Sequence, residues 1–145
     1  MSPAYFSLSE LIGSNKAIEK KIKNIPNWEQ LASLQDLAIN YLDPIRKQWN
    51  APITVSSGFR SLELNKQLKG SSTSSHLEGK AVDLQPNNPT KENVEKLWKF
   101  ICKFLQENKM EWDQCYIENS QGKTWWVHLG LGDKMRCEIG SWTKK

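Results

Sequence analysis

The stretch from Ser74 to Asp83 carries two residue types that bind metal ions in proteins. It reads Ser-Ser-His-Leu-Glu-Gly-Lys-Ala-Val-Asp and contains His76, one of two histidines in the chain. Asp83 follows in a segment of alternating apolar character, where it shares a face with Ala81 and Gln85. A carboxylate on a buried strand requires a cation or a hydrogen-bond donor beside it.

The second histidine, His128, lies in another strand-like run, Trp125 to Leu129. Two histidines and one aspartate form a three-ligand set that zinc accepts, with a fourth position left for water. The alternative is that both histidines are ordinary side chains and that Asp83 caps a turn. For an isolated histidine this alternative would be favoured.

Further motifs decide between these readings. The pattern Ser-x-His-x-x-Gly-x-Ala-x-Asp, followed downstream by Trp-Val-His, resembles the zinc D-alanyl-D-alanine carboxypeptidase family of cell-wall metallopeptidases, which includes the peptidase domains of phage endolysins. The segment from Ser57 to Ser61 resembles the Ser-Gly-Tyr-Arg-Ser element of that family. The resemblance implies one zinc ion held by His76, Asp83 and His128, because both histidines fall in matching motifs.

The catalytic base is less well marked. Some relatives carry Glu-x-x-His or His-x-His before the last ligand, but this chain has Trp125 and Trp126 at those positions. We predict that Glu118 replaces the missing base, on the assumption that a symmetric hairpin pairs position 118 with 125. Asp113 is the reserve candidate, or a partner that orients His128. The alternative for Glu118 is an exposed residue at a hairpin mouth.

Arg60 and Ser74 are the predicted substrate-binding residues. By resemblance, Arg60 stabilises the developing oxyanion or docks a substrate carboxylate. The alternative is a surface salt bridge with Glu63, three residues further on. Ser74, beside the first ligand, is expected to bind substrate or to hold its loop.

Composition sets limits on the partners of the chain. A length of 145 residues predicts a single domain, residues 1–145, and a net charge of +4 with 25% charged residues is only mildly basic. No basic run or recognised module supports nucleic-acid binding.

Four tryptophans could form a platform for wall peptides or pack within the sheet: Trp112, Trp125, Trp126 and Trp142. Three cysteines without a CxxC motif predict reduced thiols.

The first residues, Met1 to Ser7, have neither a basic nor an apolar region of the kind found in signal peptides. No stretch approaches the length of a membrane span. We therefore expect the chain to accumulate in the cytoplasm without membrane insertion. We also expect it to be a monomer. It would act on the cell wall after release or export by another route.

The pattern of elements predicts an α+β fold. N-terminal helices, one of them running from Asn27 past Pro44, are expected to pack on a small, mainly antiparallel sheet whose exposed face holds the metal. Ser7 and Glu10 are expected to form a capping box, and helices are expected to be capped at Asn27, Ser61 and Thr90. Three late strand runs, Gln114 to Glu118, Trp125 to Leu131 and Met135 to Ile139, are expected to be joined as hairpins, with a frayed tail from residue 143.

The function that the resemblance implies is hydrolysis of a peptide bond in the stem peptides of bacterial peptidoglycan, with metal-activated water as the nucleophile. The bond is expected to involve a D-amino acid. Both a carboxypeptidase and an endolysin-type endopeptidase fit this description. The alternative is a zinc-stabilised binding module without turnover, because the scaffold also resembles the signalling domain of hedgehog proteins.

Overall fold

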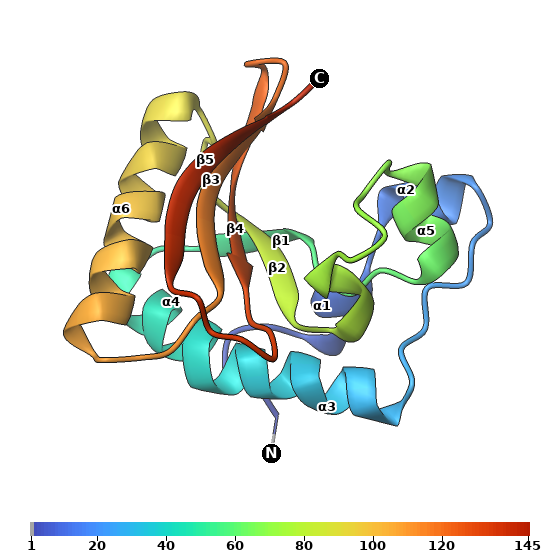
Figure 1. Cartoon of the computed structure of the whole chain (residues 1–145), viewed down its shortest axis with the longest axis horizontal. Helices are drawn as coiled ribbons and strands as arrows, with labels where there is room; N and C mark the ends of the chain where they lie inside the picture. Colours follow the sequence, from blue (N-terminus) through green and yellow to red (C-terminus); the bar gives the residue numbers. More distant parts are fainter. Residues whose placement is uncertain (1) are drawn as a thin grey trace.

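The computed structural model describes residues 2–145 and shows the predicted α+β architecture. The first half of the chain is mostly helical, and the second half contains strands β2 to β5 together with the longest helix, α6 (Figure 1). The helical elements are α1 (Leu8–Ile12), α2 (Asn15–Glu19), α3 (Trp28–Leu37), the π-helical turn η1 (Ala38–Leu42), α4 (Asp43–Trp49), α5 (Leu62–Gln67), the 3-10 turn η2 (Ser75–Glu78) and α6 (Lys91–Glu107). The strands are β1 (Ile53–Ser57), β2 (Ala81–Pro86), β3 (Gln114–Ser120), β4 (Thr124–Gly130) and β5 (Glu138–Lys144).

Side-chain caps begin the helices where the sequence predicts them. Each capping oxygen accepts a hydrogen bond from the backbone three residues later, at Ser7, Asn27, Ser61 and Thr90. The predicted capping box of Ser7 and Glu10 is only half formed, because the Glu10 carboxylate accepts from the backbone of Val55 instead. Pro44 lies at the start of α4, so the long helical run is divided at η1 into two abutting helices.

The five strands form one sheet in the order β1-β2-β4-β3-β5. All neighbouring pairs are antiparallel except β3 and β5, which run parallel. The expected hairpin between the last two strands is therefore wrong. Strand β4 has β2 on one side and β3 on the other, so β5 cannot pair with β4 and joins the free edge of β3 instead. The expected frayed tail is also wrong, because Thr143 and Lys144 pair with Asn119 and Ser120.

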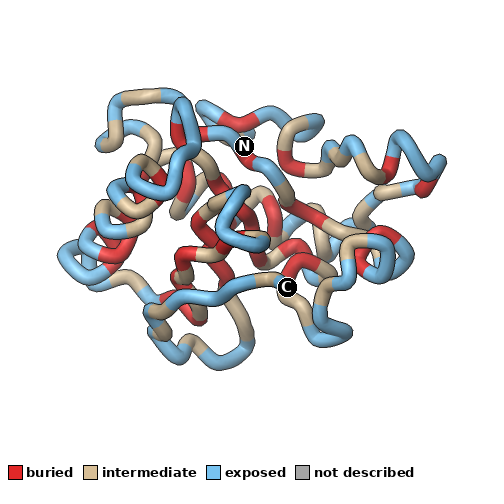
Figure 2. Tube along the Cα trace, turned by 90° about the horizontal axis from the view of Figure 1, so that it is seen from above, coloured by how far each residue is buried: buried red, intermediate tan, exposed pale blue. Residues whose placement is uncertain are grey.

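The two faces of the sheet differ in character. One face is apolar and belongs to the main core, through Val82, Leu84, Cys115, Ile117, Val127 and Leu129. Helix α6 covers this face, while α2 and α5 lie on the other side of the sheet (Figure 1). The burial pattern shows buried residues concentrated in the centre of the molecule and exposed loops around it (Figure 2). The opposite face carries mainly polar side chains, together with Trp126 and Trp142.

Within residues 2–145, no helix combines the length and the apolar character that crossing a membrane requires. The three cysteines are free thiols. Cys102 and Cys115 are buried with their sulfur atoms 3.4 Å apart, and Cys137 is exposed.

Candidate metal centre

Three different elements bring the candidate ligands together. His76 comes from η2, Asp83 from β2 and His128 from β4. Asp83 and His128 are directly opposite each other in the β2–β4 register, so both point to the polar face of the sheet. His76 is delivered by η2, which is capped by the Ser74 hydroxyl accepting from the backbone N–H of His76 at 3.2 Å. Ser74 therefore holds the loop, one of its two predicted roles.

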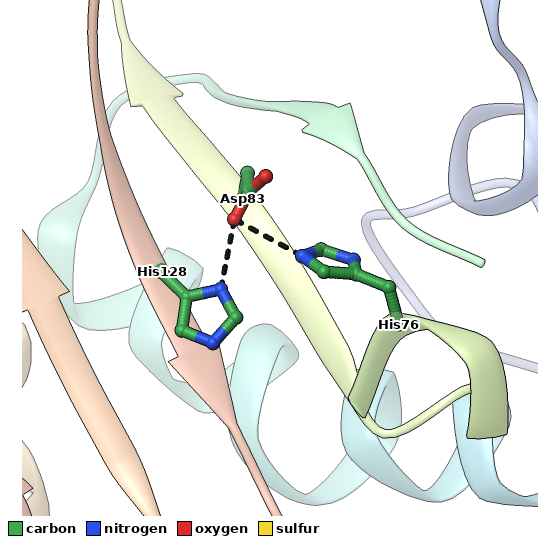
Figure 3. Close-up of side chains that lie close together, drawn as sticks. All are labelled: His76, Asp83 and His128. Carbon is green, nitrogen blue, oxygen red and sulfur yellow. Dashed lines mark hydrogen bonds and ion pairs between the residues drawn. The ribbon is translucent and has the colours of Figure 1, made fainter. Parts of the chain in front are cut away.

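The three side chains converge on one point (Figure 3). Asp83 Oδ1 lies 3.3 Å from His76 Nε2 and 3.0 Å from His128 Nδ1. All three candidate ligand atoms lie within 4.8 Å of one another. Zinc in a tetrahedron, bound at about 2.0–2.1 Å, separates its ligands by roughly 3.3 Å. The side chains thus need only small movements to hold such an ion, and the donor set suits zinc.

Neighbouring groups prepare His76 and Asp83 for a cation. His76 Nδ1 donates to the carbonyl oxygen of Gly58 at 2.7 Å, which leaves Nε2 unprotonated in the neutral ring and directed at Asp83. Burial lowers the pKa of His76, so the neutral, ligating form is favoured. Burial alone would raise the pKa of Asp83, but His76 and His128 lower it far below its usual range, so the carboxylate is ionised.

Arg60 contacts the far side of the same carboxylate. Its Nη2 donates to Asp83 Oδ2 at 3.2 Å, while Nε donates to Ser57 and Nη1 to Asn65. This leaves Asp83 Oδ1 free to face the histidines. The ion pair with Glu63 considered from the sequence is not formed, and Arg60 lines the cleft instead.

The register of the β3–β4 hairpin places Glu118 on the ligand side. Glu118 pairs with Trp126, not with Trp125 as assumed from the sequence, so the expected register is wrong by one residue. Because Tyr116 pairs with His128, Glu118 shares the face of that histidine. Trp126 Nε1 donates to Glu118 Oε1 at 2.9 Å, and burial raises the pKa of Glu118. Glu118 is half-buried and lines the cleft, so it is not an exposed residue at the mouth of the hairpin.

Asp113 has a different environment. Both of its oxygens accept from the Arg136 guanidinium, at 2.7 and 3.1 Å. The hydrogen bond from Arg136 lowers the pKa of Asp113. Asp113 lines the same cleft but contacts Arg136, whereas the partner of His128 Nδ1 is Asp83. In the described residues, the carboxylate of Asp113 is thus bound to Arg136 and the imidazole of His128 to Asp83, and the role of Asp113 stays a prediction.

The cluster opens into a cleft of about 890 Å³. Its lining includes Glu118, Arg60 and two of the four tryptophans considered from the sequence, Trp126 and Trp142. The other two belong to packing, since Trp112 is buried in the core and Trp125 packs against its edge. A metal in the cluster would thus face a space large enough for a short peptide.

One family comparison agrees with this arrangement. The model of a family described as Peptidase M15 matches residues 4–112. The chain belongs to the peptidase M15 family. Members of this family are metal-dependent peptidases, and membership implies a zinc metallopeptidase. A search of curated proteins gives no match.

The M15 match includes His76, Asp83 and Arg60 but ends before Glu118 and His128. The fold supplies the remainder of the site, because β4 lies between β2 and β3 and brings both residues onto the face of Asp83. Sequence reasoning missed Gly58, Tyr116 and Lys144 of β5. Alternation along β3 could have indicated Tyr116, two residues before Glu118.

Gly58 gives a first testable prediction about the M15 metal centre. A Cβ at this position would lie 2.1 Å from the backbone oxygen of Leu11, so Gly58→Ala must displace the strand end whose carbonyl orients His76. We expect zinc affinity to fall about 10- to 100-fold, measured by competition with a chromophoric chelator. Gly122→Ala, in the turn between β3 and β4, is the control for backbone strain without a clash, because its φ is +71° but nothing lies within 4 Å of a Cβ there. Equal zinc affinities in the two variants would contradict this role of Gly58.

Proposed function

We propose that this M15 peptidase hydrolyses a peptide bond, one involving a D-amino acid, in the stem peptides of bacterial peptidoglycan. The observation that carries the proposal is the convergence of His76, Asp83 and His128 at the wall of a peptide-sized cleft that also contains Glu118 and Arg60. The motif resemblance supports the substrate class. The proposed ligands are the two histidines and the aspartate.

The chain's own residues divide the work of hydrolysis. Zinc in this site would supply Lewis acidity and an activated water near neutral pH. Glu118 is the proposed base: it accepts the proton of the attacking water and returns it to the leaving amine. Its raised pKa makes Glu118 a better proton acceptor than Asp113, whose carboxylate is held by Arg136.

Arg60 has two proposed tasks. Three of its N–H groups are used by Ser57, Asn65 and Asp83, which fix the guanidinium and orient the proposed ligand Asp83. A guanidinium has five such donors, so two remain for a substrate oxygen that gains charge during the reaction. Ser74 lines the cleft next to His76 and is the second proposed contact with substrate.

The test is mass spectrometry of purified peptidoglycan incubated with the protein. We expect new peptide fragments from the protein as purified, none after chelation, and the same fragments again when zinc is restored. The masses of the fragments would identify the bond that is cut, and thereby separate carboxypeptidase from endopeptidase activity.

Absence of fragments from several wall chemistries, with one zinc bound per chain, would contradict the proposal. In that case co-sedimentation with wall material would support the zinc-stabilised binding module instead. The cleft position of Glu118 favours turnover over binding alone, because a half-buried carboxylate with a raised pKa in the same cleft as a metal site has a catalytic use.

A further inference from the structure

The charged side chains around the cleft are unevenly paired. Arg60 is paired with Asp83, and Arg136 is paired with Asp113 and Glu138. The lining contains three lysines. Lys16 is paired with Glu19, whereas Lys69 and Lys144 form no ion pair with any residue in the range 2–145. Within the described residues, the cleft therefore contains two positive charges that no carboxylate pairs with.

Strand β5 places Lys144 on the cleft side. Trp142 pairs with Glu118 in the parallel register, and Lys144 lies two residues further on, so its side chain projects from the same face. Lys144 Nζ then donates to the carbonyl oxygen of Leu68 at 2.7 Å, which joins β5 to the loop after α5. Two of its three ammonium donors remain for another acceptor.

Lys69 follows Leu68 directly, so the two lysines occupy the same end of the cleft. Burial, followed by the nearby charges of Arg60 and Lys69, lowers the pKa of Lys144. Keeping like charges together costs free energy, and a bound anion would remove that cost. The exposed Trp142 beside them offers a flat apolar surface for the neighbouring part of a ligand.

We propose that Lys69 and Lys144 form an anion subsite that binds a free carboxylate of the substrate. The subsite makes acidic peptides, with a carboxylate away from the reacting carbonyl, the preferred substrates of the cleft. This inference rests on the proposed peptidase function and specifies its substrate class. Arg60 is less suited to this task, because its positive charge is already paired with the Asp83 carboxylate.

The test compares stem peptides released from peptidoglycan, used as free acids and after conversion of their carboxylates to methylamides. For Lys69→Met and Lys144→Met we expect the KM of the free acids to rise about tenfold with little change in kcat, and to depend less on salt. For the methylamides, we expect the wild type and all three variants to have the same raised KM. Lys96→Met, on the far side of the sheet in α6, is the control with the same loss of charge.

Lys144→Met also removes the bond to Leu68, so Lys69→Met provides the variant that leaves this contact intact. Equal losses for free acids and methylamides, or an unchanged KM in Lys69→Met, would overturn the subsite while leaving the peptidase function in place.

Calorimetric titration of the same two peptide forms into the zinc-loaded protein separates the two proposals if no cleavage occurs. Binding that requires both the free carboxylate and the lysines would support the subsite, and only the proposed turnover would be withdrawn. Binding that does not depend on the free carboxylate, or that does not depend on the two lysines, would overturn the subsite as well.

Discussion

Replacement of His76 with alanine is expected to abolish peptide hydrolysis and to weaken zinc binding by about two to three orders of magnitude. Structural zinc sites bind with roughly 10–16 kcal/mol shared among four ligands, so one ligand accounts for a few kcal/mol. His76 is 2% exposed and lies 3.3 Å from Asp83, so neither water nor a neighbouring side chain takes its place without rearrangement. Zinc affinity by chelator competition and turnover of wall peptides are the measurements.

Ser72→Ala provides the control, because Ser72 is an exposed residue of the same loop and is not among the proposed ligands. It should bind zinc like the wild type. Stoichiometric zinc with wild-type affinity in His76→Ala would contradict the proposed ligand set.

The His76 experiment requires a folded variant, and the position of the site supports this. The main core lies on the other face of the sheet, among α3, α4, α6 and the apolar strand residues. Without metal, Asp83 still has a cationic partner in Arg60, so no isolated charge is buried. We therefore expect chelation to lower the melting temperature while the near-ultraviolet circular dichroism stays native-like.

Short-range patterns were sufficient to predict much of the site. The alternation of residue types in β2 was sufficient to predict that Asp83 lies on the face of the sheet away from the core, because successive side chains of a strand point to opposite faces. The helix caps at Asn27, Ser61 and Thr90 were predictable for the same reason, since each depends on a contact three residues away.

Long-range pairing could not be predicted in the same way. The turn after Ser120 leaves the β3–β4 register open by one residue, and that residue decides which strand position faces Glu118. The parallel docking of β5 on β3 depends on which sheet edge is free, which only the whole topology determines. The sequence pattern therefore predicts a frayed tail at Lys144, whereas in the structure β5 brings this residue into the cleft.

The identity of the base was open for the same reason, and a second substitution addresses it. Glu118→Gln is expected to retain zinc and to lower kcat about 100- to 10,000-fold, the usual contribution of a positioned proton acceptor. The glutamine carbonyl can still accept the hydrogen bond from Trp126 Nε1, so the geometry of the site should be preserved. Zinc stoichiometry and single-turnover rates on wall peptides are the measurements.

Asp113→Asn is the matched comparison, because both changes turn a cleft carboxylate into an amide. It disrupts the paired contact with Arg136, so we expect a loss of stability and a much smaller effect on kcat than in Glu118→Gln. The reverse order of effects, with Glu118→Gln active and Asp113→Asn inactive while folded and zinc-bound, would move the base to Asp113. Because Arg136 lowers the proton affinity of Asp113 while burial raises that of Glu118, the electrostatics of the cleft favour the first outcome.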